Sequence, residues 1–343
     1  MSNKPRCLVR GSINVDEFFH VPSIVQPGET LSSTHYERRS GGKGANQAVA
    51  VAKGGGDVTL VGAVGSDGNW VLDGLKQVGV DISSVFVTQE EPTGRAIIQL
   101  TPQGENCIIL HRGANYTPIS EEAVRSVLFT HLLLQNEIPF ASTLSALAHA
   151  HRSGATTLFN PSPIPSVEQL RIFPWSQLDW LLVNQGEALS LLRAFNSQTN
   201  ESSQNSHISI DIPSSWPSRP EIRAAYLLLH RLRANTAFSP KVNLVCTLGG
   251  LGVLALLNSG EGLYVPAAKL NGPVKDTTGA GDCFTGYLVA GLMEVETDGR
   301  IESLAKDVVE RILRRAIEAA GICVQRPGAT ESIPYRTELP AIE

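Results

Sequence analysis

An aspartate follows a turn of small residues near the carboxyl end of the chain. Residues 276–282 read Asp-Thr-Thr-Gly-Ala-Gly-Asp and lead directly into a helical pattern. Small residues let a backbone approach a ligand closely, and the first N–H groups of a helix attract an anion. The turn and the helix start that carries Asp282 therefore suit a phosphate or a developing metaphosphate group. A role as a plain helix cap would also explain an aspartate at this position.

A second glycine-rich turn lies near the amino end. Residues 40–47 read Ser-Gly-Gly-Lys-Gly-Ala-Asn-Gln and again open a helical pattern. Lys43 and Asn46 are three residues apart, so both side chains can reach a ligand above the helix N-terminus. The segment lacks the spacing of a Walker A phosphate loop. A capping turn with a solvated lysine is the alternative interpretation.

A third polar motif follows the first predicted strand. Asn14 and Asp16 are two residues apart, so they face the same side of an extended chain. An amide and a carboxylate together offer a donor and acceptors, which suits the adjacent hydroxyl groups of a sugar. An ordinary turn would also accommodate both residues.

Short apolar segments alternate with helical patterns along most of the chain and must position these motifs. The segments with strand character are residues 8–10, 58–61, 131–134, 156–159, 180–183 and 242–247. The alternation predicts an α/β fold with a doubly wound, mostly parallel sheet flanked by helices. In such folds, ligands bind beyond the carboxyl ends of the strands.

Three stretches interrupt this alternation. Residues 17–40 and 94–112 form short extended pieces, and the second contains a hairpin signal. We expect them to pair into a small sheet outside the main one, where it would cover a ligand or another subunit. Residues 196–220 are rich in Ser, Asn, Gln and Pro, which predicts a flexible surface insertion.

Composition excludes several classes of partner. The net charge is −5 and no run of Lys or Arg is present, so neither nucleic acid nor an anionic membrane is an expected partner. No apolar run approaches the roughly 20 residues of a membrane span, and the first residues lack a signal-peptide pattern. Five scattered cysteines without CxxC spacing predict reduced thiols and a cytoplasmic protein, with nuclear presence left open.

Taken together, the motifs resemble the ribokinase branch of the PfkB carbohydrate kinase family. The resemblance rests on residues 41–47, preceded by Pro-Gly-Glu-Thr at 27–30, and on residues 276–282. It runs from about residue 8 to residue 334, except for 196–220, and implies one kinase domain over 1–343 with the small sheet as a lid. The implied reaction is transfer of the γ-phosphoryl group of ATP to the 5-hydroxyl of ribose, with Asp282 as base and Gly279, Ala280 and Gly281 as anion hole.

The resemblance also assigns the remaining site residues. It implies that ribose is bound by Asn14, Asp16, Gly42, Lys43, Asn46, Glu137 and Asp282. It implies that ATP is bound by Asn184, Glu187, Thr247, Gly249, Gly250, Gly252 and Gly281, with Mg²⁺ held by Glu187 through water. It implies a K⁺ site at Asp276, Thr278, Cys323, Arg326, Gly328 and Ser332, and a homodimer formed through the lid.

Two other functions remain open from the sequence. The acceptor could be another PfkB substrate, such as a nucleoside, pseudouridine or fructose. A catalytically dead sugar-binding regulator is a further alternative, although such a protein would be free to lose Asp282. The family often has an asparagine near the adenine where this chain has Ile317, so the preferred nucleotide also stays open.

Overall fold

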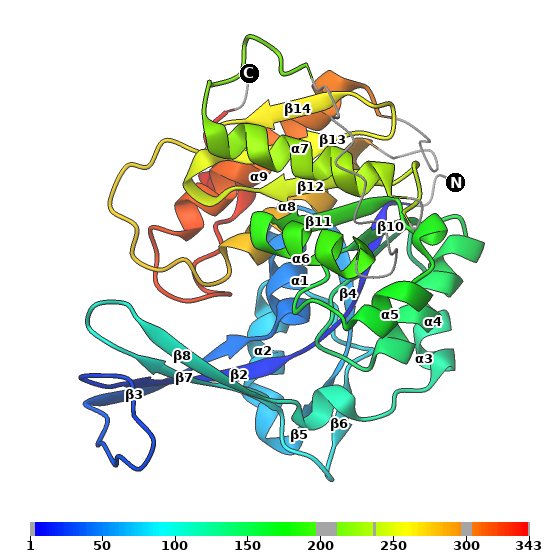
Figure 1. Cartoon of the computed structure of the whole chain (residues 1–343). Helices are drawn as coiled ribbons and strands as arrows, with labels where there is room; N and C mark the ends of the chain where they lie inside the picture. The colour runs from blue at the N-terminus through cyan, green and yellow to red at the C-terminus, as the bar shows by residue number, and fades with distance from the viewer. Residues whose placement is uncertain (1–3, 197–210, 236–237, 296–303, 342–343) are drawn as a thin grey trace.

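The main sheet has eight strands and runs through the middle of the protein (Figure 1). This computed structural model describes residues 4–196, 211–235, 238–295 and 304–341. From one edge of the sheet to the other, the strands are β14 (Gly262–Val265), β13 (Val253–Leu256), β12 (Asn243–Thr247), β11 (Trp180–Asn184), β10 (Thr156–Phe159), β9 (His131–Leu134), β1 (Arg6–Arg10) and β4 (Asp57–Val61). All neighbours pair in parallel except β12 with β13 and β13 with β14.

Helices cover both faces of this sheet because its strands are apolar on both sides. In β1, Cys7 and Val9 join one buried cluster and Leu8 joins the other, as the two-residue period of a strand requires. The first face is covered by α1 (Lys43–Lys53), α2 (Asn69–Gln77), α8 (Ala280–Val295) and α9 (Lys306–Cys323). The second is covered by α3 (Glu121–Arg125), α4 (Phe140–Arg152), α5 (Val167–Ile172), α6 (Gln185–Asn196) and α7 (Pro220–Ala234). The predicted α/β fold is confirmed.

The two stretches that break the main alternation pair into one small sheet beside the main body (Figure 1), as predicted. Its strands, in spatial order, are β3 (His35–Gly41), β2 (Asn14–His20), β7 (Gly94–Leu100) and β8 (Asn106–His111). The strand β2 begins at Asn14, so both Asn14 and Asp16 belong to the small sheet. This sheet therefore carries part of the polar motif into the region above the main sheet.

Shorter elements complete the chain. They are the paired strands β5 (Ala63–Gly65) and β6 (Phe86–Thr88), and the 3₁₀ turns η1 (Ser66–Gly68), η2 (Gly113–Tyr116), η3 (Trp175–Gln177), η4 (Gly249–Leu251) and η5 (Arg336–Glu338). Of the predicted insertion 196–220, residues 197–210 lie outside the described residues, and 211–219 form no helix or strand. All five cysteines are unpaired thiols. Within the described ranges, no helix is long and apolar enough to cross a bilayer.

The helices α1 and α8 pack against each other with almost no space between them. A Cβ atom on Gly286 of α8 would lie 2.3 Å from the Ala50 Cβ and 2.7 Å from the Gln47 carbonyl oxygen of α1. Only a glycine fits at such a separation. This contact brings the first turn of α8, which carries Asp282, against the first turns of α1.

We predict that Gly286→Ala lowers the free energy of unfolding by about 1–3 kcal/mol, because the added methyl group overfills the helix contact. The matched control is Gly74→Ala in α2, where a Cβ would meet nothing within 4 Å. That change should raise the free energy of unfolding by about 0.5–1 kcal/mol, since alanine is the better helix former. Urea denaturation of the three proteins measures both effects. Equal stability of Gly286→Ala and the unmodified protein would contradict the close packing.

Candidate active site

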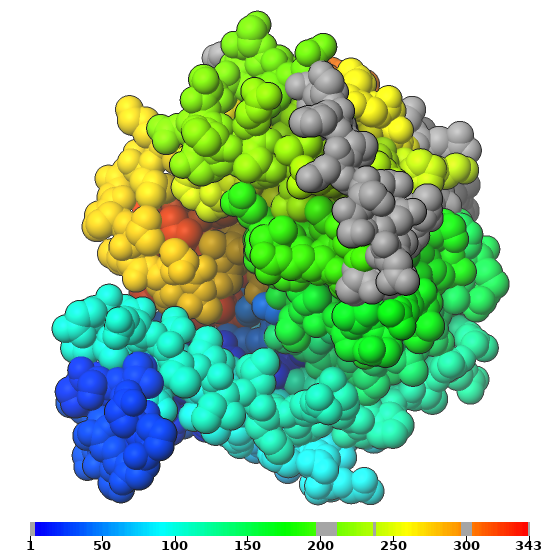
Figure 2. Space-filling model, in the orientation of Figure 1, coloured from blue at the N-terminus to red at the C-terminus, as the bar shows by residue number. Residues whose placement is uncertain are grey.

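A cavity of about 180 Å³ lies beyond the carboxyl ends of the main-sheet strands. Figure 2 shows the surface hollowed where the small sheet, in blue and cyan, meets the helices of the main body. Several residues singled out from the sequence line this cavity: Lys43, Asn184, Glu187, Thr247, Gly279, Gly281 and Asp282. They come from six separate elements or loops, so the fold is what assembles them.

Asp282 lies in the first turn of α8 and is 8% exposed. Its Oδ2 accepts a hydrogen bond from Asn46 Nδ2 at 3.0 Å, and its Oδ1 accepts one from Gln47 Nε2 at 2.9 Å. Both donors belong to α1. The carboxylate of Asp282 therefore points to the neighbouring helix α1 and lies beside the cavity. A residue that only capped its own helix would not need these two contacts.

The turn before Asp282 presents backbone rather than side chains to the cavity. Gly279 has a φ of +75°, and a Cβ on it would lie 2.9 Å from the Ala329 Cα. A Cβ on Gly281 would meet nothing within 4 Å, so the space above this residue is open. In α8, which starts at Ala280, the Ala280 N–H donates to the Thr277 carbonyl at 3.3 Å and the Cys283 N–H to the Gly279 carbonyl at 2.7 Å. The N–H groups of Gly281 and Asp282 are the other donors of this first turn. An anion placed here would meet these donors and the positive end of the helix dipole.

Asn14 and Asp16 lie at the base of the small sheet and are both buried. Asn14 Oδ1 accepts a hydrogen bond from Asn115 Nδ2 at 2.7 Å, so a ligand would meet the amide NH₂ group of Asn14. Burial, reinforced by the charges of Glu137, Asp282 and Glu331, raises the pKa of Asp16 to about 7. The carboxyl group of Asp16 is therefore about half protonated at neutral pH before a ligand arrives.

The backbone around residue 41 closes against this carboxyl group. A Cβ on Gly41 would lie 2.1 Å from Asp16 Oδ2, so only glycine at position 41 leaves room for the Asp16 side chain. Gly42 has a φ of +87° and precedes α1 as its N-cap residue. The paired glycines thus let the start of α1 approach the polar end of β2.

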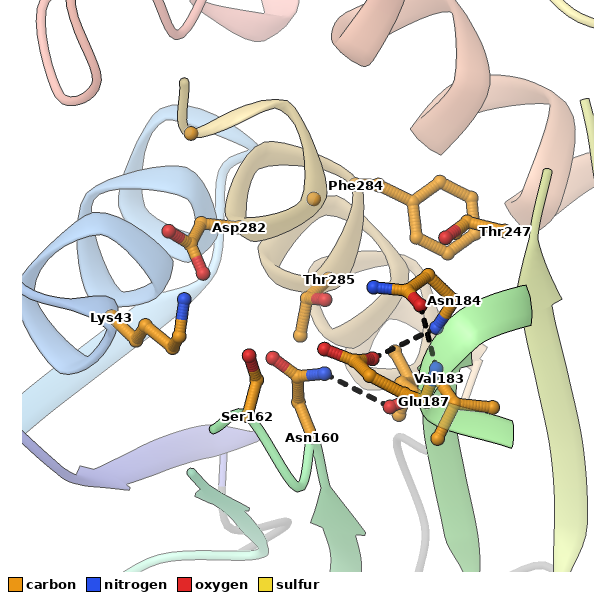
Figure 3. Close-up of a pocket in the computed structure, with 13 residues that line it drawn as sticks. Lys43, Asn160, Ser162, Val183, Asn184, Glu187, Thr247, Asp282, Phe284 and Thr285 are labelled. Atoms are coloured by element: carbon orange, nitrogen blue, oxygen red, sulfur yellow. Dashed lines mark hydrogen bonds between the residues drawn. The ribbon is translucent and has the colours of Figure 1, made fainter. Parts of the chain in front are cut away.

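Glu137 fixes the glycine-rich turn from the other side. Its Oε2 accepts hydrogen bonds from the Lys43 backbone N–H at 3.0 Å and from the Ser12 hydroxyl at 2.6 Å. The Lys43 ammonium reaches into the space below Asp282 (Figure 3). Burial lowers the pKa of Lys43, but the surrounding carboxylates, led by Asp282 and Glu137, outweigh that effect and hold it above its usual value. Lys43 is therefore a stable positive charge in the cavity.

Asn184 and Glu187 form the opposite wall of the cavity, at the junction of β11 and α6 (Figure 3). The Asn184 N–H donates to Glu187 Oε2 at 2.9 Å, and the Glu187 N–H donates to Asn184 Oδ1 at 2.8 Å. This reciprocal pair is a capping arrangement at the start of α6. Both side chains line the cavity as well, so capping orients them toward a ligand instead of competing with binding.

The remaining nucleotide residues follow β12. Thr247, its last residue, lines the cavity, whereas Gly249, Gly250 and Gly252 lie in the adjoining turn η4 and its C-cap, outside the cavity wall. A Cβ on Gly249 or Gly250 would meet no atom within 4 Å, so this turn presents an open surface. It can accept a flat group that extends out of the cavity.

The residues assigned to a monovalent cation lie on two adjoining loops. Asp276 joins the loops, since its Oδ1 accepts from the Thr278 N–H and its Oδ2 from the Gly328 N–H, both at 2.9 Å. The Cys323 sulfur and the Ser332 hydroxyl are 3.0 Å apart and bonded to each other. Arg326 directs its guanidinium to Glu338 at 2.5 Å, so only its backbone carbonyl could serve a cation.

This donor set suits a weakly bound, hard cation. It includes the carboxylate of Asp276, which accepts one hydrogen bond at each oxygen and has lone pairs to spare, and hard cations prefer oxygen ligands. Over the described part of the chain, no group of three or more His, Cys, Asp or Glu residues could hold a metal ion. The residues therefore fit K⁺ held largely by carbonyl groups, and a Mg²⁺ ion that keeps most of its waters at Glu187.

Sequence reasoning missed several polar residues of the site. Gln47 and Gln135 support Asp282 from behind, Asn115 holds Asn14, and Asn160 and Ser162 form the floor between Lys43 and Glu187 (Figure 3). A signal existed for Asn160, because it directly follows a predicted strand at the edge where ligands bind. Asn115 gave none, since it lies in a 3₁₀ turn whose neighbours carry no motif.

Known proteins share this sequence and fold over almost the whole chain. The profile of the pfkB family carbohydrate kinases matches residues 4–211 and 225–336. The ribokinase of Haemophilus influenzae is 30% identical, over 96% of this chain and 95% of that protein. A crystal structure of Cryptococcus neoformans var. grubii ribokinase in complex with ADP is 47% identical, with a TM-score of 0.80, and the match covers 97% of this chain and 98% of that one.

A ligand-bound relative extends the comparison. The structure of Arabidopsis thaliana ribokinase complexed with ribose and ATP is 27% identical, with a TM-score of 0.74, over 97% of this chain and 96% of that one. The fold, the glycine-rich turns at its ligand-binding edge and the family profile all agree. The chain is a member of the pfkB family of carbohydrate kinases.

Proposed function

We propose that this protein is a ribokinase, which transfers the γ-phosphoryl group of ATP to the 5-hydroxyl of ribose. The observation that carries the proposal is the place of Asp282, between the polar residues of the small sheet and α1 on one side and the open glycine turn on the other. Full-length relatives that are named ribokinases support the choice of ribose.

In this mechanism, Asp282 accepts the proton of the 5-hydroxyl as the hydroxyl oxygen attacks the γ-phosphorus. A new O–P bond forms, the bond to the β-phosphate oxygen breaks, and ADP leaves. The turn of Gly279, Ala280 and Gly281 and the ammonium of Lys43 would stabilise the charge that spreads over the transferring group. Of these, Gly279, Gly281 and Lys43 line the cavity. The chain thus supplies position and electrostatic stabilisation, which is most of what phosphoryl transfer needs.

The proposed sugar site has polar atoms in need of a partner. Asn46 Oδ1 is buried, and no hydrogen-bond partner for it exists among the described residues. A buried amide oxygen without a partner is costly, and a sugar hydroxyl would satisfy it. The amide of Asn14, the carboxyl group of Asp16, the backbone of Gly42, Lys43 and Glu137 would complete the set.

Two ions would complete the nucleotide side. Glu187 would hold Mg²⁺ through water, with Asn184 beside it, and the bound ion would neutralise charge on the phosphates of ATP. Potassium would be held by the residues assigned to it: Asp276, Thr278, Cys323, Arg326, Gly328 and Ser332. That set adjoins Gly279, which lies so close to Ala329 that a Cβ on Gly279 would be 2.9 Å from the Ala329 Cα.

A substrate panel tests the proposed function. Ribose, fructose, pseudouridine and a purine nucleoside are each offered with Mg-ATP, with and without K⁺, and ADP release is measured. We expect turnover with ribose, and faster turnover when K⁺ is present. Asp282→Asn should bind ribose and ATP with near-normal affinity in calorimetry while turnover falls at least about 100-fold, since it loses the general base.

Each outcome of the panel has a definite meaning. Turnover of a nucleoside or fructose without turnover of ribose would reassign the acceptor within the family. Ribose binding without turnover of any acceptor would point to a sugar-binding regulator. Near-normal turnover by Asp282→Asn would remove Asp282 from its proposed role.

The raised pKa of Asp16 predicts that ribose binding depends on pH. A sugar hydroxyl donates to the ionised carboxylate, so affinity should rise as the pH increases through about 7 and then level off. The raised pKa also affects folding, because the folded protein holds the proton of Asp16 more tightly than the unfolded chain does. The contribution of this protonated carboxyl group to the stability of the fold is therefore full at low pH and is lost as the pH rises toward about 7.

Calorimetric titration with ribose between about pH 5.5 and 8.5 measures the effect, with Asp16→Asn as the matched variant, because an amide does not titrate in this range. We expect the pH dependence to disappear in Asp16→Asn. An affinity for ribose that is flat or falls with pH in the unmodified protein would contradict this role of Asp16.

We propose that the small sheet also forms the contact of a homodimer. Its edge strand β8 exposes three consecutive large apolar side chains, Ile108, Ile109 and Leu110, each more than half exposed. An open edge of this kind can pair with a second chain.

Light scattering at micromolar concentration should give twice the mass of the chain, and Ile109→Lys should give the monomer. Leu128→Lys, at a residue 80% exposed elsewhere, is the control. A monomeric unmodified protein would refute the dimer.

A further inference from the structure

Gln47 is a fully buried side chain that lies between three polar groups of the site. Its Nε2 donates to Asp282 Oδ1 at 2.9 Å and to Asn160 Oδ1 at 3.2 Å. Its Oε1 accepts from Gln135 Nε2 at 2.6 Å. Gln135 follows β9 and is fully buried as well. The amide of Gln47 thus connects the ends of two main-sheet strands with the first turn of α8.

These partners leave the Gln47 amide only one orientation. An ionised carboxylate can only accept hydrogen bonds, so the NH₂ group of Gln47 must face Asp282. Gln135 then donates to the amide oxygen from the opposite side. Asn160 is held in turn, because its Nδ2 donates to the Leu182 carbonyl at 2.9 Å. Hydrogen bonds thus run from Asp282 Oδ1 through the Gln47 amide to Gln135 and Asn160, and both of these residues follow main-sheet strands. The main sheet therefore sets the position of Asp282 Oδ1.

We infer that Gln47 is a positioning residue for phosphoryl transfer, and that Gln135 acts through it. Gln47 holds one oxygen of Asp282 and favours the ionised carboxylate, so that the remaining lone pairs meet the acceptor hydroxyl. This inference rests on the proposed kinase activity. It adds a role for a side chain that makes no contact with the residues assigned to ribose other than Asp282.

The charges around Asp282 show what the Gln47 hydrogen bond must do. Lys43 of α1 lies near Asp282; burial lowers the pKa of Lys43, but the charge of Asp282 and of other carboxylates holds it above its usual value. Asp16 of β2 and the buried thiols of Cys283 and Cys323 also face Asp282. A second carboxylate in a buried site opposes ionisation of the first. A donor on Oδ1 counteracts that repulsion whether or not a ligand is present.

Three variants test the inference. Gln47→Met keeps the length of the side chain and removes its hydrogen bonds. We expect kcat to fall on the order of tenfold, because the base is less well placed. We also expect a change in the pH dependence of kcat. Its acid limb, the pH range in which kcat falls as Asp282 is protonated, should move up by about one pH unit, because the ionised carboxylate loses a hydrogen-bond donor. Gln47→Glu should move that limb further, because it places a second carboxylate beside Asp282. Gln135→Met should move it in the same direction but less.

The readout is kcat at saturating ribose, because titration of Asp16 affects ribose binding. The KM for ribose should stay within about threefold, as expected for a residue that acts through the base. The control is Gln177→Met, the same substitution at a glutamine in η3, which lies before β11 at the other end of the strands. It should leave kcat and the acid limb unchanged. Thermal unfolding shows whether each variant is folded.

The outcomes separate this inference from the proposed function. An unchanged acid limb in folded Gln47→Met and Gln47→Glu, with the unmodified protein active on ribose, would overturn the positioning role alone. If neither Gln47 variant folds, the acid limb of Gln135→Met decides in the same way. No turnover by the unmodified protein with any acceptor would overturn the proposed function and this inference together.

Discussion

The close contact between α1 and α8 is the constraint on which the site depends. Gly286 lets the two helices approach until their first turns meet, and the Asp282 carboxylate then reaches Asn46 and Gln47. Asp282 lies more than 230 positions after either of these two residues in the chain. As the proposed base, Asp282 would need no large rearrangement when the acceptor hydroxyl arrives, because two amide donors from another helix already hold it. Such preorganisation is the main contribution of a protein to phosphoryl transfer.

The same helix α1 also organises both sides of the site. Its first turn carries Lys43 and approaches the small sheet. Its last residue, Lys53, is buried beside the loop that contains Gly328 and Thr330. The Lys53 ammonium donates to the Thr330 carbonyl at 3.1 Å and to the Ile333 carbonyl at 2.8 Å. One rigid helix thus connects the proposed sugar site with the loop proposed to hold K⁺.

The pKa values of the charged residues in the site depend on burial as much as on neighbouring charges. Lys43 is surrounded by carboxylates and stays protonated, whereas Asp16 has its pKa raised to about 7 because burial and its neighbours both oppose its ionisation. A neutral sugar that brings hydroxyl donors would relieve this repulsion without adding charge. The phosphates of a nucleotide would instead meet Lys43 and the start of α8, on the other side of Asp282. Under the proposed function, the buried Asn14, Asp16 and Asn46 would bind hydroxyl groups, and the cavity beside Lys43 and α8 would bind the phosphates.

The sequence by itself determined the α/β fold, the separate small sheet and the glycine turns, because these depend on local periodicity and on residues such as Gly279 that few others can replace. It also pointed to Asp282, but it left open whether that side chain caps its helix or faces a ligand. Only the tertiary structure decided where the carboxylate of Asp282 points, since its partners Asn46 and Gln47 lie on a different helix. The contacts of Gln135, Asn115 and Asn160 were beyond prediction for the same reason. They arise where strand order brings distant chain segments to one edge of a sheet, and strand order leaves no mark in local sequence.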